Sequence, residues 1–208
     1  MKKVIVKTKL YNRQNLLMVL NEIVFDFEPS YWQNDRIFVP KNYNRDNGSP
    51  RLSLRTVVRR DGKTIYALVM RQHLAKNGLD IINRTVVEDY AEAAHIIYSL
   101  GYVLRADISR RREELQMGES VKLYIDNIDG LDGYYLKIET VLGEKEDAAA
   151  ARQDLIETFK VLELRNASPV ALTYGELLET GAHDVEDIPT PEDEALAEIE
   201  RIENESNN

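Results

Sequence analysis

The stretch that decides the fold runs from 108 to 114 and reads ISRRREE, inside a longer segment, 103–117, that we expect to be mainly strand. Successive side chains of a strand point to opposite faces, so Arg110, Arg112 and Glu114 lie together on one face. Arg111 then points to the other face. Two arginines and a carboxylate on one side of a strand indicate a charged wall.

Sorting the neighbouring segments by alternate residues gives further basic faces. In 52–59 the alternation separates a charged side from a second side that carries Leu52 and Leu54. Arg71 ends the next predicted strand, 64–71. The groups that share a face are Lys7 with Lys9; Ser53 with Arg55, Val57 and Arg59; Lys122 with Tyr124 and Asp126; and Lys137 with Glu139.

Any one of these faces could simply be solvated. Like charges directly opposite one another destabilise strand pairing, and two unit charges 4 Å apart repel by roughly 4 kcal/mol at an effective dielectric constant of 20. Basic side chains repeated on several strands therefore indicate an anion that relieves the repulsion. Phosphate suits this role because arginine presents a planar fork of donors.

The segments up to residue 180 alternate strands with helices, which predicts an α+β fold. Apolar spacing and helix propensity predict helices over 16–27, 87–100 and 146–164, with Gly101 closing the second. Asp61-Gly62 predicts the turn of a hairpin between 52–59 and 64–71. The two strands of this hairpin bring the total to about seven or eight strands. The others are expected at 4–10, 36–39, 103–117, 121–126 and 134–141.

Charge and composition narrow the class of protein. The net charge is −9 over 208 residues, but 181–208 carry ten Asp or Glu and one Arg, so 1–180 are neutral. We expect 181–208 to be an acidic, flexible tail, either solvated or covering a basic site as a ligand mimic. There is no cysteine, which excludes disulfides and a thiol nucleophile. No apolar run approaches the roughly 20 residues of a membrane span, and we expect a cytoplasmic protein without a signal peptide.

Several blocks of the sequence resemble the CYTH superfamily, which includes class IV adenylate cyclases, thiamine triphosphatases and inorganic triphosphatases. They are LGY at 100–102, SRRR at 109–112, DNIDGL at 126–131 and KIE at 137–139. The family has LGF, K-x-R, an aspartate before a hydrophobic-x-GLG turn, and E-I-E. LSLR at 52–55 resembles its L-R-x-R strand, and TYGELL at 173–178 resembles the S-Y-x-x-L-L of the cyclase-like branch.

The resemblance covers 1–180 and implies an antiparallel eight-stranded β-tunnel flanked by helices, which holds a triphosphate. It implies Asp126 and Glu139 as catalytic carboxylates that, with Glu114 as a third candidate ligand, would hold one Mg²⁺ or Mn²⁺. With the basic faces it gives the candidate phosphate-binding residues Arg55, Arg71, Arg110, Arg112, Lys7, Lys9, Lys122 and Lys137.

The sequence departs from the family at its metal positions. The family opens with E-x-E-x-K, yet the first acidic residue here is Glu22, and Lys137 replaces the first glutamate of the closing strand. Lysine supplies charge but does not generate a metal-activated nucleophile. Two functions stay open: metal-dependent turnover, as a cyclase or phosphohydrolase, or binding of a nucleotide or other phosphorylated ligand without turnover.

The expected partner is a small-molecule triphosphate, whether a nucleoside triphosphate, thiamine triphosphate or polyphosphate. A neutral body argues against nucleic acid, and the missing apolar span argues against a membrane. A homodimer is a further expectation, because dimers occur in the cyclase-like branch.

Overall fold

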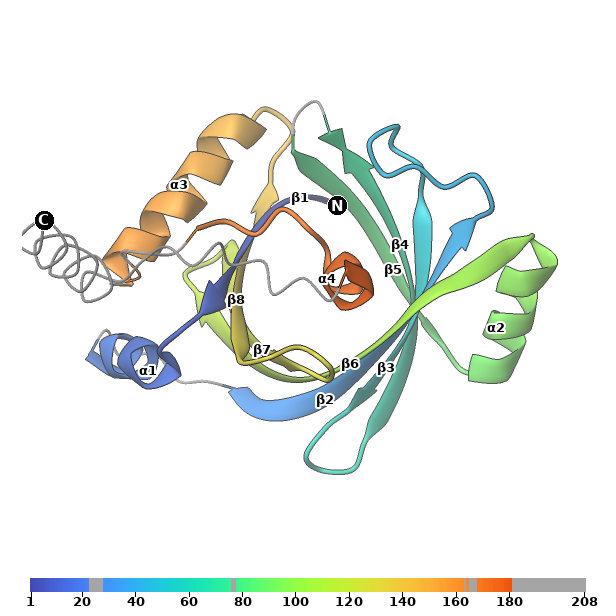
Figure 1. Ribbon diagram of the computed structural model, residues 1–208, viewed down its shortest axis with the longest axis horizontal. Helices are drawn as coiled ribbons and strands as arrows, with labels where there is room; N and C mark the ends of the chain where they lie inside the picture. The colour runs from blue at the N-terminus through green and yellow to red at the C-terminus, as the bar shows by residue number, and fades with distance from the viewer. Residues whose placement is uncertain (23–27, 76–77, 163, 165–167, 181–208) are drawn as a thin grey trace, which may run out of the picture.

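The computed structural model describes residues 1–22, 28–75, 78–162, 164 and 168–180. Within them eight antiparallel strands close into a barrel in the order β1-β5-β4-β3-β2-β6-β7-β8 (Figure 1), which confirms the expected fold. The tail expected at 181–208 lies outside the described residues. The strands are β1 (Lys2–Leu10), β2 (Glu28–Pro40), β3 (Arg51–Val58), β4 (Thr64–Leu74), β5 (Leu79–Val87), β6 (Tyr102–Met117), β7 (Val121–Ile128) and β8 (Tyr134–Leu142).

The barrel has its apolar side outside and its charged side inside. On β1, Val4 and Val6 are 0% and 2% exposed and pack against helices outside the barrel, whereas Lys3 and Lys7 line the interior. Alternation along each strand makes this division possible, because neighbouring residues face opposite ways. The apolar core therefore lies between the outer face of the barrel and the helices, and the inner faces of the strands enclose a polar cavity.

The main core lies where α1 (Arg13–Glu22) and α3 (Ala148–Val161) cover β1, β7 and β8. Figure 1 shows both helices on the same side of the barrel. Leu16 and Phe159 contribute one fully buried side chain from each helix. Each such side chain stabilises the fold by about 1.5–3 kcal/mol relative to exposure.

A second core lies under α2 (Tyr90–Ser99), where Ile97 packs against Phe38 and Leu54. The Asp89 side chain caps this helix by accepting a hydrogen bond from the Glu92 amide at 2.9 Å. Gly101 follows the last turn with a φ of 83°, which confirms the predicted stop.

A short helix, α4 (Tyr174–Thr180), lies across the barrel interior in the view of Figure 1. Tyr174 and Leu177 pack on Ile37 and Ile108, and Tyr174 also lines the cavity. TYGELL at 173–178 includes most of this helix, so the segment that resembles the family's closing motif forms part of the cavity wall.

The predicted hairpin forms, and some boundaries differ from expectation. Gly62 sits at φ 81° in the β3–β4 turn, where Arg59 and Lys63 pair through their backbones at 3.0 Å. The strand expected at 36–39 is only the end of β2, and β5 was not predicted at all. Both segments carry polar residues toward the cavity, such as Asp35 and Asp80, so they lack an apolar alternation.

The helix boundaries also shift. The helix predicted from residue 87 begins at Tyr90, because β5 continues to Val87. The first helix is described to Glu22, and 23–27 lie outside the described residues. Among the helices of the described segments, none has the length and apolarity needed to cross a membrane.

Candidate functional site

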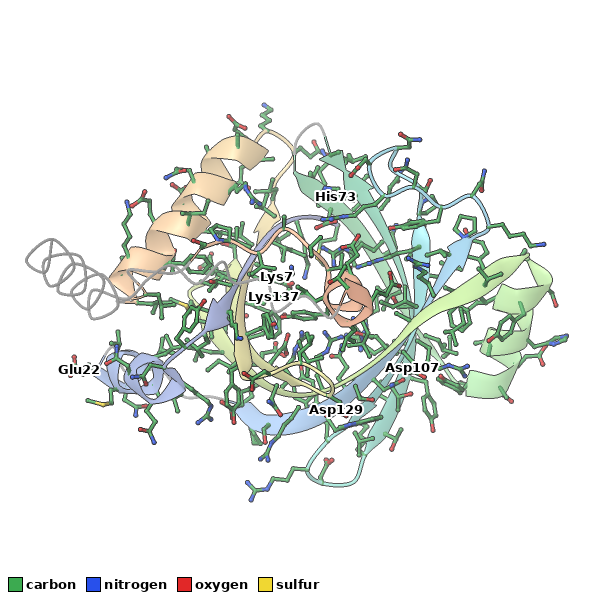
Figure 2. All side chains as sticks on the ribbon, viewed as in Figure 1. Lys7, Glu22, His73, Asp107, Asp129 and Lys137 are labelled. Atoms are coloured by element: carbon green, nitrogen blue, oxygen red, sulfur yellow. The ribbon has the colours of Figure 1, made fainter. Side chains whose placement is uncertain are left out.

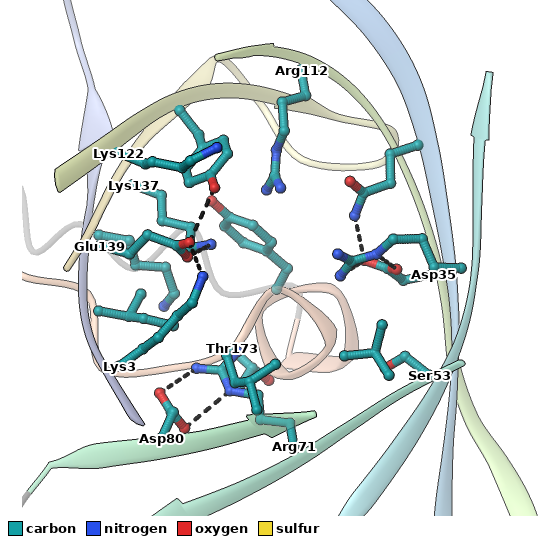
Figure 3. A pocket seen from close by; sticks show the side chains of 18 of the residues that line it. Lys3, Asp35, Ser53, Arg71, Asp80, Arg112, Lys122, Lys137, Glu139 and Thr173 are labelled. Atoms are coloured by element: carbon teal, nitrogen blue, oxygen red, sulfur yellow. Dashed lines mark hydrogen bonds and ion pairs between the residues drawn. The ribbon is translucent and has the colours of Figure 1, made fainter. Parts of the chain in front are cut away.

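The barrel encloses a cavity of about 1100 Å³. Thirteen Lys or Arg and seven Asp or Glu line it, so the lining is net positive although residues 1–180 are neutral overall. Lys7 and Lys137, which are labelled in the barrel interior in Figure 2, lie directly opposite each other on β1 and β8. Figure 3 shows charged side chains from several strands around the hollow.

Asp35 on β2 joins two arginines from the neighbouring strands. Its side chain is 5% exposed, accepts a hydrogen bond from Arg55 Nε at 2.6 Å and also pairs with Arg110. Burial, and after it the charge of Arg112, lower the pKa of Arg55 and Arg110 to about 10. Both arginines therefore stay charged at neutral pH, and one carboxylate balances only one of them.

Asp126 on β7 and Arg112 on β6 form a buried, bidentate ion pair. Arg112 donates its Nε to Oδ1 and its Nη2 to Oδ2, each at 2.6 Å. The Tyr174 hydroxyl of α4 adds a hydrogen bond to Oδ2 at 3.0 Å. Burial alone would raise the pKa of Asp126, but Arg112 outweighs it and lowers the pKa to about 2.

Glu139 on β8 is held by two lysines and a tyrosine. Lys137 donates to Oε2 at 2.6 Å, Lys3 pairs with Oε1, and the Tyr124 hydroxyl donates to Oε1 at 3.0 Å. Burial opposes ionisation, yet Lys137 and Lys3 hold the pKa of Glu139 well below its usual range. Burial in turn lowers the pKa of Lys137 to about 8.

Two further carboxylates of the cavity each pair with a single Lys or Arg. Arg71 donates to Asp80 at 3.0 and 2.6 Å through Nε and Nη2. Lys122 donates to Oε1 of Glu114 at 2.5 Å, and the Tyr31 hydroxyl donates to Oε2 at 2.9 Å. These strand carboxylates are therefore all neutralised within the protein.

Four basic side chains gather near the segment that leads into α4, and we call Lys7, Arg45, Arg51 and Arg71 the Lys7 cluster. Arg71 pairs with Asp80 and Arg45 lies 3.8 Å from Glu176, so within the described segments Lys7 and Arg51 carry the charge that no carboxylate balances. Arg51 lies directly opposite Arg71 on β3 and β4 and makes no ion pair to a carboxylate in the described residues. Lys7 donates to the Val170 carbonyl at 2.9 Å. Burial, followed by Arg45 and Arg71, lowers the pKa of Lys7 to about 7.

Most residues expected at a phosphate site line this one cavity, and Lys9 does not. Lys9 is on β1, but its side chain lies beside the β7–β8 turn. Its Cε is 3.7 Å from the position that a Cβ on Gly133 would occupy. Asp126 lies behind Arg112 and α4 rather than in the cavity lining. The residues that the barrel brings together are Lys7, Arg55, Arg71, Arg110, Arg112, Glu114, Lys122, Lys137 and Glu139.

Sequence reasoning missed five residues of the site: Lys3, Asp35, Arg51, Asp80 and Tyr174. Lys3 shares the face of Lys7, and Arg51 shares the face of Arg55, so extending each strand by a residue or two would have found both. Asp35 and Asp80 lie on stretches that were not predicted as strand. No signal in the sequence marks Tyr174 as the partner of Asp126.

The candidate metal ligands do not suit a divalent cation as they are arranged. Every side-chain oxygen of Glu114, Asp126 and Glu139 already accepts a hydrogen bond from a lysine, an arginine or a tyrosine. No three Asp, Glu, His or Cys side chains of the described residues are grouped as a metal site. An ion on Glu139 would lie beside the two ammonium groups that already pair with this carboxylate.

The low pKa of Lys7 predicts a rise in stability with pH. Lys7 titrates near 7 in the folded protein and near 10.5 when unfolded, so above pH 7 the unfolded chain binds the extra proton. Between pH 7 and pH 9 we expect the free energy of unfolding to rise by about 2 kcal/mol more in the wild type than in Lys7→Met.

Urea unfolding at the two pH values measures this difference. Lys9→Met makes the same substitution on the same strand outside the cavity lining and serves as the control. Parallel profiles for Lys7→Met and the wild type would show that Lys7 is not held in the cavity.

No family model matches the sequence, and no curated protein is significantly similar to it. Solved structures share the architecture. PH1819 of Pyrococcus horikoshii superposes with a TM-score of 0.72 at 18% identity, over 86% of this chain and 99% of its own. A proposed adenylate cyclase of Vibrio parahaemolyticus superposes with a TM-score of 0.69 at 16% identity, over 85% of this chain and 97% of its own. HpAC1 of Hippeastrum, a proposed adenylyl cyclase with a dominant triphosphatase activity, superposes with a TM-score of 0.54 at 12% identity, over 87% of this chain and 96% of its own.

These proteins match nearly along their full lengths, so the likeness concerns the whole barrel with its helices. The closed eight-stranded barrel, its charged interior and this likeness together agree with the resemblance read from the sequence. The chain therefore has the CYTH-type triphosphate tunnel fold.

Proposed function

We propose that the protein binds a triphosphate-bearing small molecule inside the barrel. The observation that carries the proposal is the Lys7 cluster, in which Arg51 and Arg71 face each other without enough carboxylate to balance them. Buried like charges are costly unless a counter-charge accompanies them. A chain of phosphates supplies several negative charges along one line and suits the row of cations on successive strands.

The enclosed shape favours a small ligand over a nucleic acid. The basic side chains point into a cavity of about 1100 Å³, and α4 with the preceding residues 169–173 forms part of its wall. A duplex needs a basic outer surface, whereas the positive charge here is internal. A nucleoside triphosphate, thiamine triphosphate or short polyphosphate satisfies both the size and the charge.

Ligand binding should raise the melting temperature. A ligand at 100 times its dissociation constant stabilises the folded state by about 2.7 kcal/mol, which corresponds to about 5–10 °C for a domain of this size. We expect this shift with tripolyphosphate and a loss of it at high salt, and differential scanning fluorimetry measures both. Sulfate at equal ionic strength is the control. An unchanged melting temperature with tripolyphosphate, ATP and thiamine triphosphate would remove the proposal.

Turnover of the bound triphosphate is a second candidate, favoured by the shared fold with HpAC1 and its triphosphatase activity. Asp126 and Glu139 would be the carboxylates involved. Incubation with ATP, thiamine triphosphate and tripolyphosphate, with and without Mn²⁺, tests it. Product release that Glu139→Gln abolishes would support an enzyme, and ligand stabilisation without product would support a binding protein.

A further inference from the structure

Three lysines surround one carboxylate on the wall formed by β1 and β8. Lys3 and Lys137 both pair with Glu139, and Lys7 lies directly opposite Lys137 across the two strands. The side chains of Lys3, Lys137 and Glu139 are 17%, 15% and 6% exposed. With all three lysines protonated, this wall carries two more positive charges than negative ones where the candidate metal-binding glutamate lies.

A divalent cation at Glu139 would meet these ammonium groups at close range. Lys3 and Lys137 pair with the two carboxylate oxygens, so the ion would either share these oxygens with the lysines or displace lysines that stay in the same cavity. Asp126 offers no second anchor, because its side chain is completely buried against Arg112 and lies outside the cavity lining. Like charges repel strongly where water is scarce.

The same ammonium groups can do part of what a metal does for a polyphosphate. A lysine is a compact positive charge with three donors, and it binds phosphate as a point charge. Lys3, Lys7 and Lys137 present three such charges along one side of the cavity. A bound phosphate chain could share them with Glu139 without displacing any group from the wall.

We propose that the tunnel takes its triphosphate free of divalent metal, with Lys3, Lys7 and Lys137 supplying the charge at this wall, so that Mg²⁺ competes with binding. The inference rests on the proposed function and makes it more specific. The ligand is the bare polyanion, and its magnesium complex is rejected because the complex carries positive charge toward the lysines. The Lys7 cluster then holds the rest of the phosphate chain.

Isothermal titration calorimetry with tripolyphosphate tests the inference on the wild-type protein. We expect the affinity in EDTA to exceed that in excess MgCl₂ by at least about tenfold, with NaCl matching the ionic strength. Equal or tighter binding in MgCl₂ overturns the inference and leaves the proposed function standing. No binding in either buffer overturns the proposed function as well.

A charge reversal on the wall gives a second, independent measurement. Lys137→Glu places two carboxylates two residues apart on one face of β8 and leaves Glu139 with Lys3. We expect binding of tripolyphosphate in EDTA to weaken at least about tenfold and direct binding of Mn²⁺, titrated alone, to appear.

Lys160→Glu makes the same substitution on α3, where the side chain is 70% exposed, and should change neither result. Lys137→Gln should weaken tripolyphosphate binding without creating a Mn²⁺ site, which keeps the test valid should Lys137→Glu fail to fold. Micromolar binding of Mn²⁺ alone to the wild type would overturn the inference.

Discussion

Replacing Asp126 by alanine is expected to lower the free energy of unfolding by about 3–5 kcal/mol, or about 6–20 °C in melting temperature for a domain of this size. The side chain is completely buried and accepts hydrogen bonds from Nε and Nη2 of Arg112, whose side chain is itself 6% exposed. Removal of the carboxylate leaves a guanidinium without its counter-charge beside two other arginines, Arg55 and Arg110, whose pKa values are already lowered by burial and, after it, by the charge of Arg112.

Thermal and urea unfolding measure this loss, and a double variant shows its cause. Asp126→Leu with Arg112→Met replaces the buried pair by apolar groups of similar size, and such replacements are often neutral. We expect it to recover at least half of the stability lost in Asp126→Ala, with the Tyr174 hydroxyl left without its acceptor accounting for part of the rest. A double variant as unstable as the single one would show that packing, rather than charge, causes the effect.

Strand alternation in the sequence predicted most of the basic residues that line the cavity. Arg55 could be placed on an inward face because Leu52 and Leu54 mark the opposite, apolar face of its strand. Arg110 and Arg112 could be placed together by strand parity, although Arg111 makes the opposite face of β6 charged as well. The outer apolar face packs on helices, so register is strongly specified, and a slip of one residue would bury the charges in the core. Lys9 shows the limit of this reasoning, because a strand continues past the end of the cavity it lines.

The neutralising carboxylates could not be placed from the sequence. Asp35 and Asp80 lie on segments whose inner faces are polar and whose outer faces are not consistently apolar, so no periodicity marks a strand there. The partner of each cation depends on which strands are neighbours in the closed barrel. The order of strands, with β2 between β3 and β6, brings Asp35 to Arg55 and Arg110.

The distribution of ion pairs separates structural cations from cations available to a ligand. Arg112 donates its Nε and Nη2 to Asp126, so its charge is already balanced by a buried carboxylate and it adds little net positive charge for a phosphate. Arg51 has no such commitment among the described residues, and it faces the cavity. Stability and binding should therefore respond to different arginines.

Arg51→Gln is expected to weaken tripolyphosphate binding by about 10- to 100-fold, the loss of one or two charge-assisted hydrogen bonds. The same change should stabilise the ligand-free protein by up to about 1 kcal/mol, because Arg51 lies directly opposite Arg71 and like charges in that position are destabilising. Burial, with Arg71 second, lowers the pKa of Arg51 to about 10, as expected for a cation that lacks its own counter-charge.

Calorimetric titration and thermal unfolding of the same samples measure the two effects together, and their opposite signs are the diagnostic result. Arg60→Gln is the matched control, because Arg60 lies in the β3–β4 turn outside the cavity lining and the substitution removes the same charge. It should leave the affinity for tripolyphosphate unchanged. If Arg51→Gln destabilised the ligand-free protein and left the affinity intact, Arg51 would be a structural residue, and the positive charge of the Lys7 cluster would have to serve something other than an anion.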